Sequence, residues 1–206
     1  LENLARKLMI DMHPVQLAVQ TYLEFDLFFA GGQFSIDYRL SPPNLVKDKT
    51  GTGFRSAVNI FLREEELKKR LEVKPITYVV GNVPIKLQSA GTKGERVILL
   101  SGANSGGKTC CIQTIAQIMI LGQMGLPVPS EETVIGLCDE LYFFSKSKGV
   151  ADAGAFESTL RTFTKVILSP NRKMILVDEL ESITEPGAAA KVIGGILEKL
   201  SENPNT

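Results

Sequence analysis

The run GANSGGKT occupies residues 102–109, that is, Gly102, Ala103, Asn104, Ser105, Gly106, Gly107, Lys108 and Thr109. It matches the pattern G-x4-G-K-[ST] at every specified position, between the apolar run VILLS and a stretch that favours a helix. Glycines let successive backbone N–H groups turn toward phosphate oxygens, and the N-terminus of the helix adds a positive electrostatic end. The pattern predicts a phosphate-binding loop in which Lys108 reaches the β- and γ-phosphates and the Thr109 hydroxyl binds Mg²⁺.

A second motif, MILVDE, ends in two carboxylates at Asp178 and Glu179. A buried strand that delivers an acid beside a phosphate loop is suited to hold Mg²⁺, so Asp178 is the predicted metal residue. Because neighbouring side chains on a strand point in different directions, Glu179 is free to align and deprotonate an attacking water as a general base. The two motifs together favour a nucleoside triphosphate hydrolase over a small-molecule kinase.

Around these motifs, runs typical of strands alternate with runs typical of helices. Strands are expected at 76–80, 83–88, 95–101, around 134–144 and at 173–179, and helices at 107–125, 156–168 and 187–200. Continuously apolar strand runs are typical of a parallel sheet that is buried between layers. We therefore expect an α/β fold over residues 75–206, with a mostly parallel central sheet flanked by helices.

The N-terminal part of the chain is expected to form two other regions. Residues 1–32 carry apolar residues at helical spacing; His13-Pro14 is expected to break or kink this helix and Gly31-Gly32 to end it. Residues 33–74 are expected to form a linking region between this helix and the α/β fold. It contains a loop at 41–53 and a charged helix at 61–72. Three pairs at i,i+4 spacing predict that this helix faces solvent: Glu64/Lys68, Glu65/Lys69 and Glu66/Arg70.

Composition excludes several classes of protein. The 206 residues include 23 Lys and Arg against 23 Asp and Glu, a zero net charge that is unlike a free-standing nucleic-acid binder. No apolar run approaches a membrane span, and three cysteines cannot form a disulfide framework, which fits a cytoplasmic protein. Adjacent Cys110 and Cys111 are expected to be buried apolar residues rather than zinc ligands, and His13 to be structural. Because Leu1 already lies in a helical pattern, we expect a fragment of a longer protein.

Three stretches in this order resemble the ATPase domain of the MutS family of DNA mismatch-repair proteins: GANSGGKT at 102–109, QMGLPVPSEE at 123–132 and VDELESITEPGAAAKVIGGILEKL at 177–200. The resemblance covers about residues 76–206, and less securely the N-terminal helix, which looks like the end of the family's lever helix. It implies an ABC-type P-loop NTPase fold, C-terminally incomplete here, that uses ATP and Mg²⁺. It also implies a homodimer, or a pair with a MutS-like partner subunit, that shares composite ATP sites and moves DNA-gripping domains outside this chain.

Individual residues follow from the resemblance. Asn104 matches the family's loop asparagine, which contacts phosphate groups, and Asp178 and Glu179 match the magnesium and water-activating acids. Val80, with Val79, aligns with the segment that packs on adenine; Tyr78 could stack there instead, and the run 76–80 could equally be core strand.

The chain departs from the family pattern in three places. Ala103 replaces a proline, a change expected to be harmless, and residues 181–184 replace the Gly-x-Gly-Thr loop that crosses between subunits. The family's Ser-Thr-Phe, which reaches the partner's γ-phosphate from a helix N-terminus, has no clean match. The candidates for this role in trans are Ser158, which we choose, and the helix start at 154–156.

Three functions remain open at this stage. The first is the ATPase motor of a mismatch-repair protein, nucleoid-associated when bound to DNA. The second is a MutS-like clamp that acts in recombination or on branched or stalled nucleic-acid assemblies without reading mismatches. The third, suggested by the altered loop at 181–183, is a nucleotide-binding scaffold that does not hydrolyse ATP.

Overall fold

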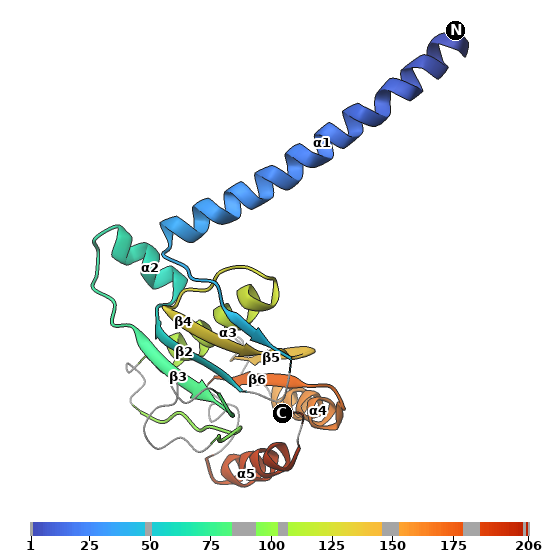
Figure 1. The fold of residues 1–206 in the computed structure, drawn as a ribbon. Coiled ribbons are helices and arrows are strands. Elements are labelled where there is room, and N and C mark those ends of the chain that lie inside the picture. Colours follow the sequence, from blue (N-terminus) through green and yellow to red (C-terminus); the bar gives the residue numbers. More distant parts are fainter. Residues whose placement is uncertain are drawn as a thin grey trace. The chain divides into compact units, whose positions relative to one another are not determined.

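A computed structural model describes residues 2–47, 51–83, 94–102, 107–145, 153–178, 186–203 and 205. The elements follow the order α1 (Glu2–Asp37), β1 (Asn44–Val46), β2 (Thr52–Ala57), α2 (Ile60–Leu67), β3 (Ile76–Val80), α3 (Lys108–Gln123), β4 (Glu132–Gly136), β5 (Glu140–Phe144), α4 (Ala153–Leu168), β6 (Lys173–Val177) and α5 (Pro186–Glu202) (Figure 1). The chain divides into two compact units, residues 1–40 and 41–206. Apart from Val83, the strand predicted at 83–88 lies outside the described residues.

The first unit is one long helix, α1, which continues past both of its predicted breaks. Pro14 lies inside the helix, and the helix passes through Gly31-Gly32 to Asp37. A proline removes one hydrogen bond of a long helix but does not have to end it. The turns after the glycines are supported by Ser35 Oγ, which donates to the Gly31 carbonyl at 2.7 Å. The helix ends where Arg39 takes a left-handed φ of 55°.

The second unit contains a four-stranded mixed sheet in the order β1-β4-β2-β3. β1 is parallel to β4, whereas β2 is antiparallel to both of its neighbours, so the predicted mostly parallel sheet is wrong. The predicted loop at 41–53 contains β1 and the start of β2. Its glycines allow close backbone approach: a Cβ on Gly51 would lie 1.7 Å from the Val80 carbonyl oxygen. Gly51 and Gly53, which suggest a loop in the sequence, therefore lie on either side of Thr52 at the start of β2, where the backbone comes close to β3.

A second sheet consists of β5 and β6, which pair in parallel from Glu140 with Lys173 to Phe144 with Val177. The strand structure predicted around 134–144 thus consists of two strands, which belong to different sheets. The strand predicted at 95–101 is absent, because residues 97–101 have no regular secondary structure. Strand propensity describes how a side chain fits a paired surface, so it does not make a strand where no ladder partner is present.

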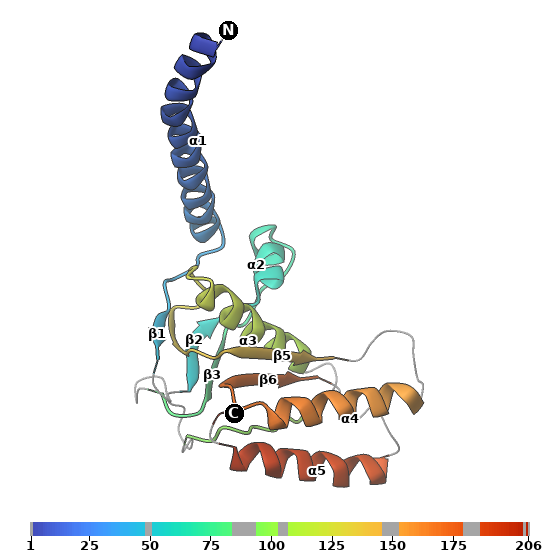
Figure 2. The same cartoon turned by 90° about the vertical axis from the view of Figure 1, so that its right-hand side faces the viewer.

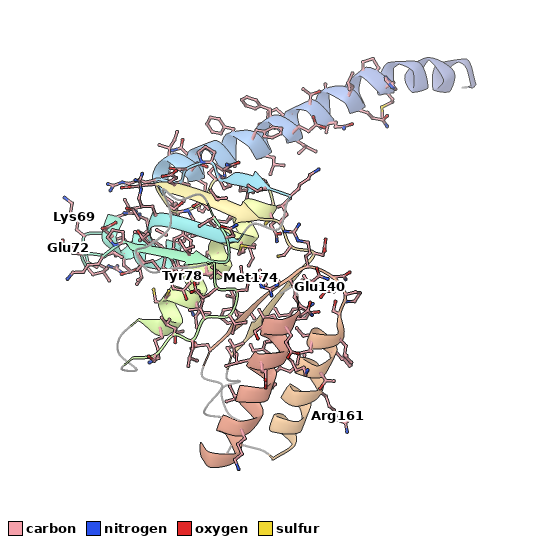
Figure 3. The ribbon with its side chains drawn as sticks, turned by 60° about the horizontal axis from the view of Figure 1, so that its bottom comes forward. Lys69, Glu72, Tyr78, Glu140, Arg161 and Met174 are labelled. Atoms are coloured by element: carbon pink, nitrogen blue, oxygen red, sulfur yellow. The ribbon has the colours of Figure 1, made fainter. Side chains whose placement is uncertain are left out.

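The core lies between the two sheets, where α3 packs. Ile118 and Met119 of α3 are fully buried and share one cluster with Phe54 of β2, Ile135 of β4 and Leu176 of β6. Tyr78 and Met174 pack against the same cluster (Figure 3). Figure 2 shows α4 and α5 alongside each other, next to β6. In this arrangement, the start of α3 and the end of β6 line the same cavity.

Helix α2 is shorter than the charged helix predicted at 61–72. The Glu64–Lys68 ion pair forms as predicted. Arg70 pairs instead with Glu65, at 3.1 Å, and Glu66 pairs with Arg63. The other two predicted pairs are lost because the helix ends at Leu67 and the following turn breaks the i,i+4 geometry. In the part of the chain that the structure describes, no helix is long and apolar enough to span a membrane.

Candidate functional site

The predicted phosphate loop is described at its two ends. Gly107 stands at the N-cap of α3 with a φ of 79°, and Gly102 has a φ of 150°; both are conformations that favour glycine. Lys108 begins α3, and its Nζ donates to the Gly102 carbonyl oxygen at 2.6 Å. Ala103, Asn104, Ser105 and Gly106 lie outside the described residues. The lysine, at the first residue of α3, therefore contacts the residue at which the predicted loop begins.

The end of β6 brings the first predicted acid to the same place. The Asp178 backbone N–H donates to the Phe144 carbonyl at 2.8 Å, which continues the β5–β6 pairing by one residue. Lys108, Thr109 and Asp178 all line one cavity of about 510 Å³. A hydroxyl and a carboxylate are hard oxygen ligands of the kind that Mg²⁺ takes, and an ammonium group suits phosphate. Glu179, the predicted general base, lies outside the described residues.

The same cavity reaches the end of β3. Tyr78 and Val80 line it, whereas Val79 between them is buried in a separate cluster with Val83 and Val134. This is the alternation expected along a strand, so Tyr78 and Val80 lie toward the cavity while Val79 belongs to the core. Tyr78 stacks on Phe54 with ring centroids 6.4 Å apart. Burial raises the pKa of the Tyr78 hydroxyl, with a further contribution from Cys111, so the ring stays neutral.

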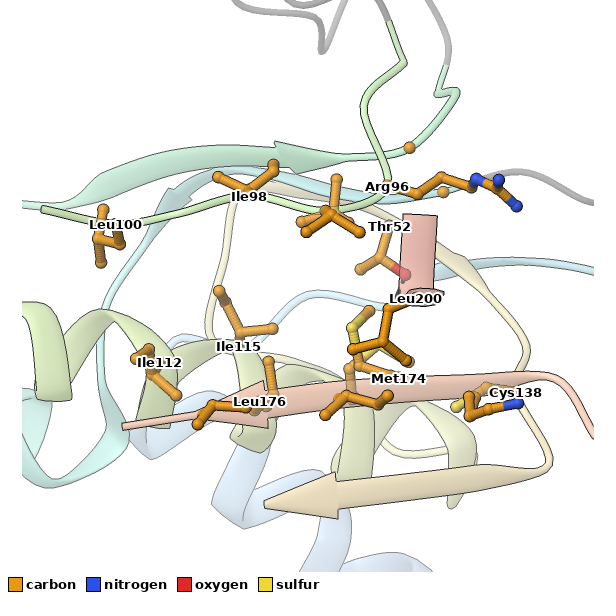
Figure 4. Close-up of a pocket in the computed structure, with 18 of the residues that line it drawn as sticks. Thr52, Arg96, Ile98, Leu100, Ile112, Ile115, Cys138, Met174, Leu176 and Leu200 are labelled. Atoms are coloured by element: carbon orange, nitrogen blue, oxygen red, sulfur yellow. Dashed lines mark hydrogen bonds between the residues drawn. The ribbon is translucent and has the colours of Figure 1, made fainter. Parts of the chain in front are cut away.

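Between these polar ends the cavity wall is apolar. Figure 4 shows Ile98 and Leu100 from the segment before the loop, opposite Ile112 and Ile115 of α3. An apolar wall with a few convergent polar groups is typical of a small-molecule site. In the described part of the chain, no three His, Cys, Asp or Glu side chains gather as a metal site. Among the described residues that line the cavity, Thr109 and Asp178 are the ones that could hold a magnesium ion together with a bound nucleotide.

The residue predicted to act in trans, Ser158, lies in α4, and its side chain is not among those described. Because α4 begins at Ala153, its first turn contains the alternative candidates at 154–156, and Ser158 lies one turn further on. The three cysteines are half-buried. Burial raises the pKa values of the Cys111 and Cys138 thiols, which favours their uncharged forms.

Sequence reasoning missed Arg96. This residue lines the cavity, and its guanidinium bonds to two carbonyl oxygens at the end of α5. A basic residue ahead of an apolar run is common, so the sequence carried no specific signal for that contact.

Comparison with known proteins finds relatives named MutS2. No family model matches the chain. The chain is 34% identical over 195 residues, 93% of its length, to the DNA-binding protein MutS2 of Pyrococcus furiosus. It is 34% identical over 141 residues, 60% of its length, to the endonuclease MutS2 of Gemmatimonas aurantiaca. It is 24% identical over 209 residues, 97% of its length, to the endonuclease MutS2 of Clostridium tetani.

The chain belongs to the MutS family. It spans only part of these MutS-family relatives: 32% of the Pyrococcus protein, 17% of the Gemmatimonas protein and 24% of the Clostridium protein. The similarity to the Pyrococcus and Clostridium relatives covers nearly the whole chain, so it includes α1 or most of it as well as the cavity.

Proposed function

We propose that this chain is the Mg²⁺-dependent ATP-binding and hydrolysing part of a MutS2-like DNA-binding protein. One observation carries the proposal: Lys108, Thr109 and Asp178, whose side chains end in an ammonium group, a hydroxyl and a carboxylate, line one cavity, although Asp178 is distant from the other two in sequence. These are the three kinds of group that hold a nucleoside triphosphate and its metal ion.

Each residue has a role in this proposal. The backbone N–H groups of the 102–109 loop, with Lys108 and the Asn104 side chain, bind the phosphates. Thr109 and Asp178 hold Mg²⁺, which offsets the phosphate charge when it is bound. Glu179 accepts the proton of the attacking water, and Val80 or Tyr78 lies against the adenine. Each group supplies charge or orientation, which is the main work of phosphoryl-transfer catalysis.

A partner subunit completes the site in this proposal. The first turn of α4 at 154–156, or Ser158 behind it, would approach the partner's γ-phosphate, because N–H groups at a helix start attract anions. ATP binding would then close the dimer. The closure would be transmitted through the helical segment 1–32 to DNA-binding domains outside this chain.

The second candidate function is a MutS-like clamp that acts on branched DNA without reading mismatches. The three relatives named above are called DNA-binding protein MutS2 or endonuclease MutS2, and none of these names mentions mismatch repair. If this clamp is correct, the full-length protein should bind branched DNA more tightly than a homoduplex, with no added affinity for a single mismatch. Tighter binding to a mismatched duplex, measured at one salt concentration, would favour mismatch repair instead.

The variant Glu179→Gln tests the ATPase. It keeps the shape of the side chain and removes the proton acceptor, so the full-length protein should bind ATP normally while its turnover falls by about 100-fold or more. Nucleotide binding and phosphate release are the measurements. Glu131→Gln is the matched control, because this exposed carboxylate pairs with Arg55 on the four-stranded sheet and does not line the cavity. Wild-type turnover by Glu179→Gln would contradict the proposed role of Glu179 and with it the ATPase assignment.

A further inference from the structure

Arg96 joins the segment that leads into the phosphate loop to the end of α5. Its Nη2 donates to the Ser201 carbonyl oxygen at 2.9 Å, and its Nη1 donates to the Asn203 carbonyl oxygen at 3.0 Å. Ser201 lies in the last turn of α5, and Asn203 follows the helix. Figure 4 shows Arg96 at the opposite end of its segment from Leu100, which is close to the loop in sequence.

The Ser201 carbonyl, in the last turn of α5, has a physical reason to take a guanidinium group, and the Asn203 carbonyl lies just beyond it. The last carbonyl groups of a helix have no partner within the helix and carry the negative end of its dipole. A guanidinium presents several N–H donors in a rigid plane, so two simultaneous bonds set both the distance and the orientation of the segment. Lysine supplies the charge without this planar fork.

The segment depends on such contacts because it has no regular secondary structure. Residues 94–102 pair with no strand, and one backbone hydrogen bond, from the Gly81 N–H to the Glu95 carbonyl at 2.7 Å, reaches the start of the segment. Leu99 is 79% exposed, so apolar packing of its side chain does little to hold this part of the segment. Side-chain contacts therefore take on the positioning that a sheet would otherwise provide.

The far side of the contact is connected to β6. The Lys173 N–H, at the start of β6, donates to the Asn205 carbonyl at 2.8 Å. The Asn205 side chain donates to the Pro170 carbonyl at 2.7 Å, and the Asn203 side chain donates to the Ile167 carbonyl at 3.3 Å. The end of α5 is thus fastened to the end of α4 and to the strand that finishes just before Asp178.

We propose that Arg96 is a positioning residue that holds the phosphate-loop segment in place relative to β6. Through this contact, ATP bound at Lys108 is aligned with Asp178 and with the water-activating acid that follows it. The inference rests on the proposed ATPase function and adds a residue to it. Because both bonds go to protein carbonyls rather than into the phosphate loop, losing Arg96 should impair turnover much more than nucleotide affinity.

The experiment compares Arg96→Ala and Arg96→Lys in the full-length protein with wild type and Lys108→Ala. Fluorescent-ATP titration gives the number of binding sites and their affinity, and phosphate release gives turnover per occupied site. Arg70→Ala is the matched control, since Arg70 is an exposed arginine that pairs with Glu65 on α2, away from the cavity. We expect Arg96→Ala to keep its binding sites and lose about 10- to 100-fold in turnover per site, the scale of a small misplacement.

The variants separate the possible outcomes. Turnover of Arg96→Lys should lie between that of wild type and Arg96→Ala, because lysine retains the charge but carries its donors on a single nitrogen. The proposal is overturned if turnover per occupied site in Arg96→Ala stays within about 2-fold of wild type, or if the loss only follows a loss of binding sites. If Lys108→Ala binds and hydrolyses ATP like wild type, the proposed ATPase site itself fails, and the role of Arg96 fails with it. Loss in Lys108→Ala with normal turnover in Arg96→Ala removes the Arg96 proposal alone.

Discussion

Two apolar runs of similar composition lead into the two nucleotide motifs, and they have different structures. The run 173–177 forms β6, with Lys173 and Leu176 buried, and it pairs with β5 along its whole length. The run 97–100 before Gly102 has no strand, and Leu99 is 79% exposed. One motif is thus carried on a paired and packed strand, and the other on a segment held by individual contacts.

The difference shows what makes an apolar run into a strand. β6 has a parallel neighbour, packs against α3, and begins beside the polar contacts of Glu140 with Ser169 and Asn171. The run before the loop follows two contacts: the Arg96 side chain donates to carbonyl groups at the end of α5, and the Gly81 N–H donates to the Glu95 carbonyl. A sheet ladder is a property of two segments, so composition alone does not decide it.

The largest expected effect comes from the polar residues that follow the two runs in sequence, Lys108 and Asp178. Lys108→Ala should abolish ATP binding with or without Mg²⁺, because it removes the charge that meets the phosphates. Asp178→Asn should lower Mg²⁺-dependent turnover by about 100- to 1,000-fold while some metal-free ATP binding remains. ATP binding and hydrolysis measured with excess Mg²⁺ or with EDTA distinguish the two. Equal losses under both conditions would contradict this division between phosphate and metal residues.

A smaller effect, on stability, tests the packing difference directly. Leu176→Ala removes a side chain that is 7% exposed, so it should lower the free energy of unfolding by about 2–5 kcal/mol. Leu99→Ala should change it by less than about 0.5 kcal/mol, because that side chain is exposed. Urea unfolding of the two variants is the measurement. A cost for Leu99→Ala close to that of Leu176→Ala would show that the run 97–100 is packed in solution and would break the comparison.

The smallest expected effect concerns the polar contacts that hold the start of the β5–β6 pair. Hydrogen bonds from Asn171, Ser169 and Tyr142 keep the pKa of Glu140 below its ordinary value of 4.5. A carboxyl group with a lowered pKa in the folded state stabilises it above that ordinary value and loses this effect as the pH falls through the folded value. Glu140→Gln should therefore lower the melting temperature slightly near pH 7, with a difference that shrinks in acid. The pH dependence of thermal unfolding measures this, and a constant difference would exclude the charge as its cause.

Some elements could be predicted because their signals are local. The strand at 76–80, the helix that starts at Lys108 and the apolar run ending before Asp178 all match the structure. Each has a dense apolar pattern or a glycine at its boundary. Strand β1 was missed because it has only three residues, and β2 because it contains a glycine and polar residues. The division between β4 and β5 was missed because one apolar pattern crosses from one sheet to the other.

The sequence by itself determined the motifs that resemble the MutS family, the residue types proposed to bind phosphate and metal, and their order along the chain. These depend on the chemistry of single residues and on short spacings. Only the tertiary structure decided that Lys108, Thr109 and Asp178 line one cavity, that the larger sheet is mixed, and that Arg96 reaches the end of α5. Each of these depends on contacts between residues distant in sequence, and those contacts form only when several elements pack at once.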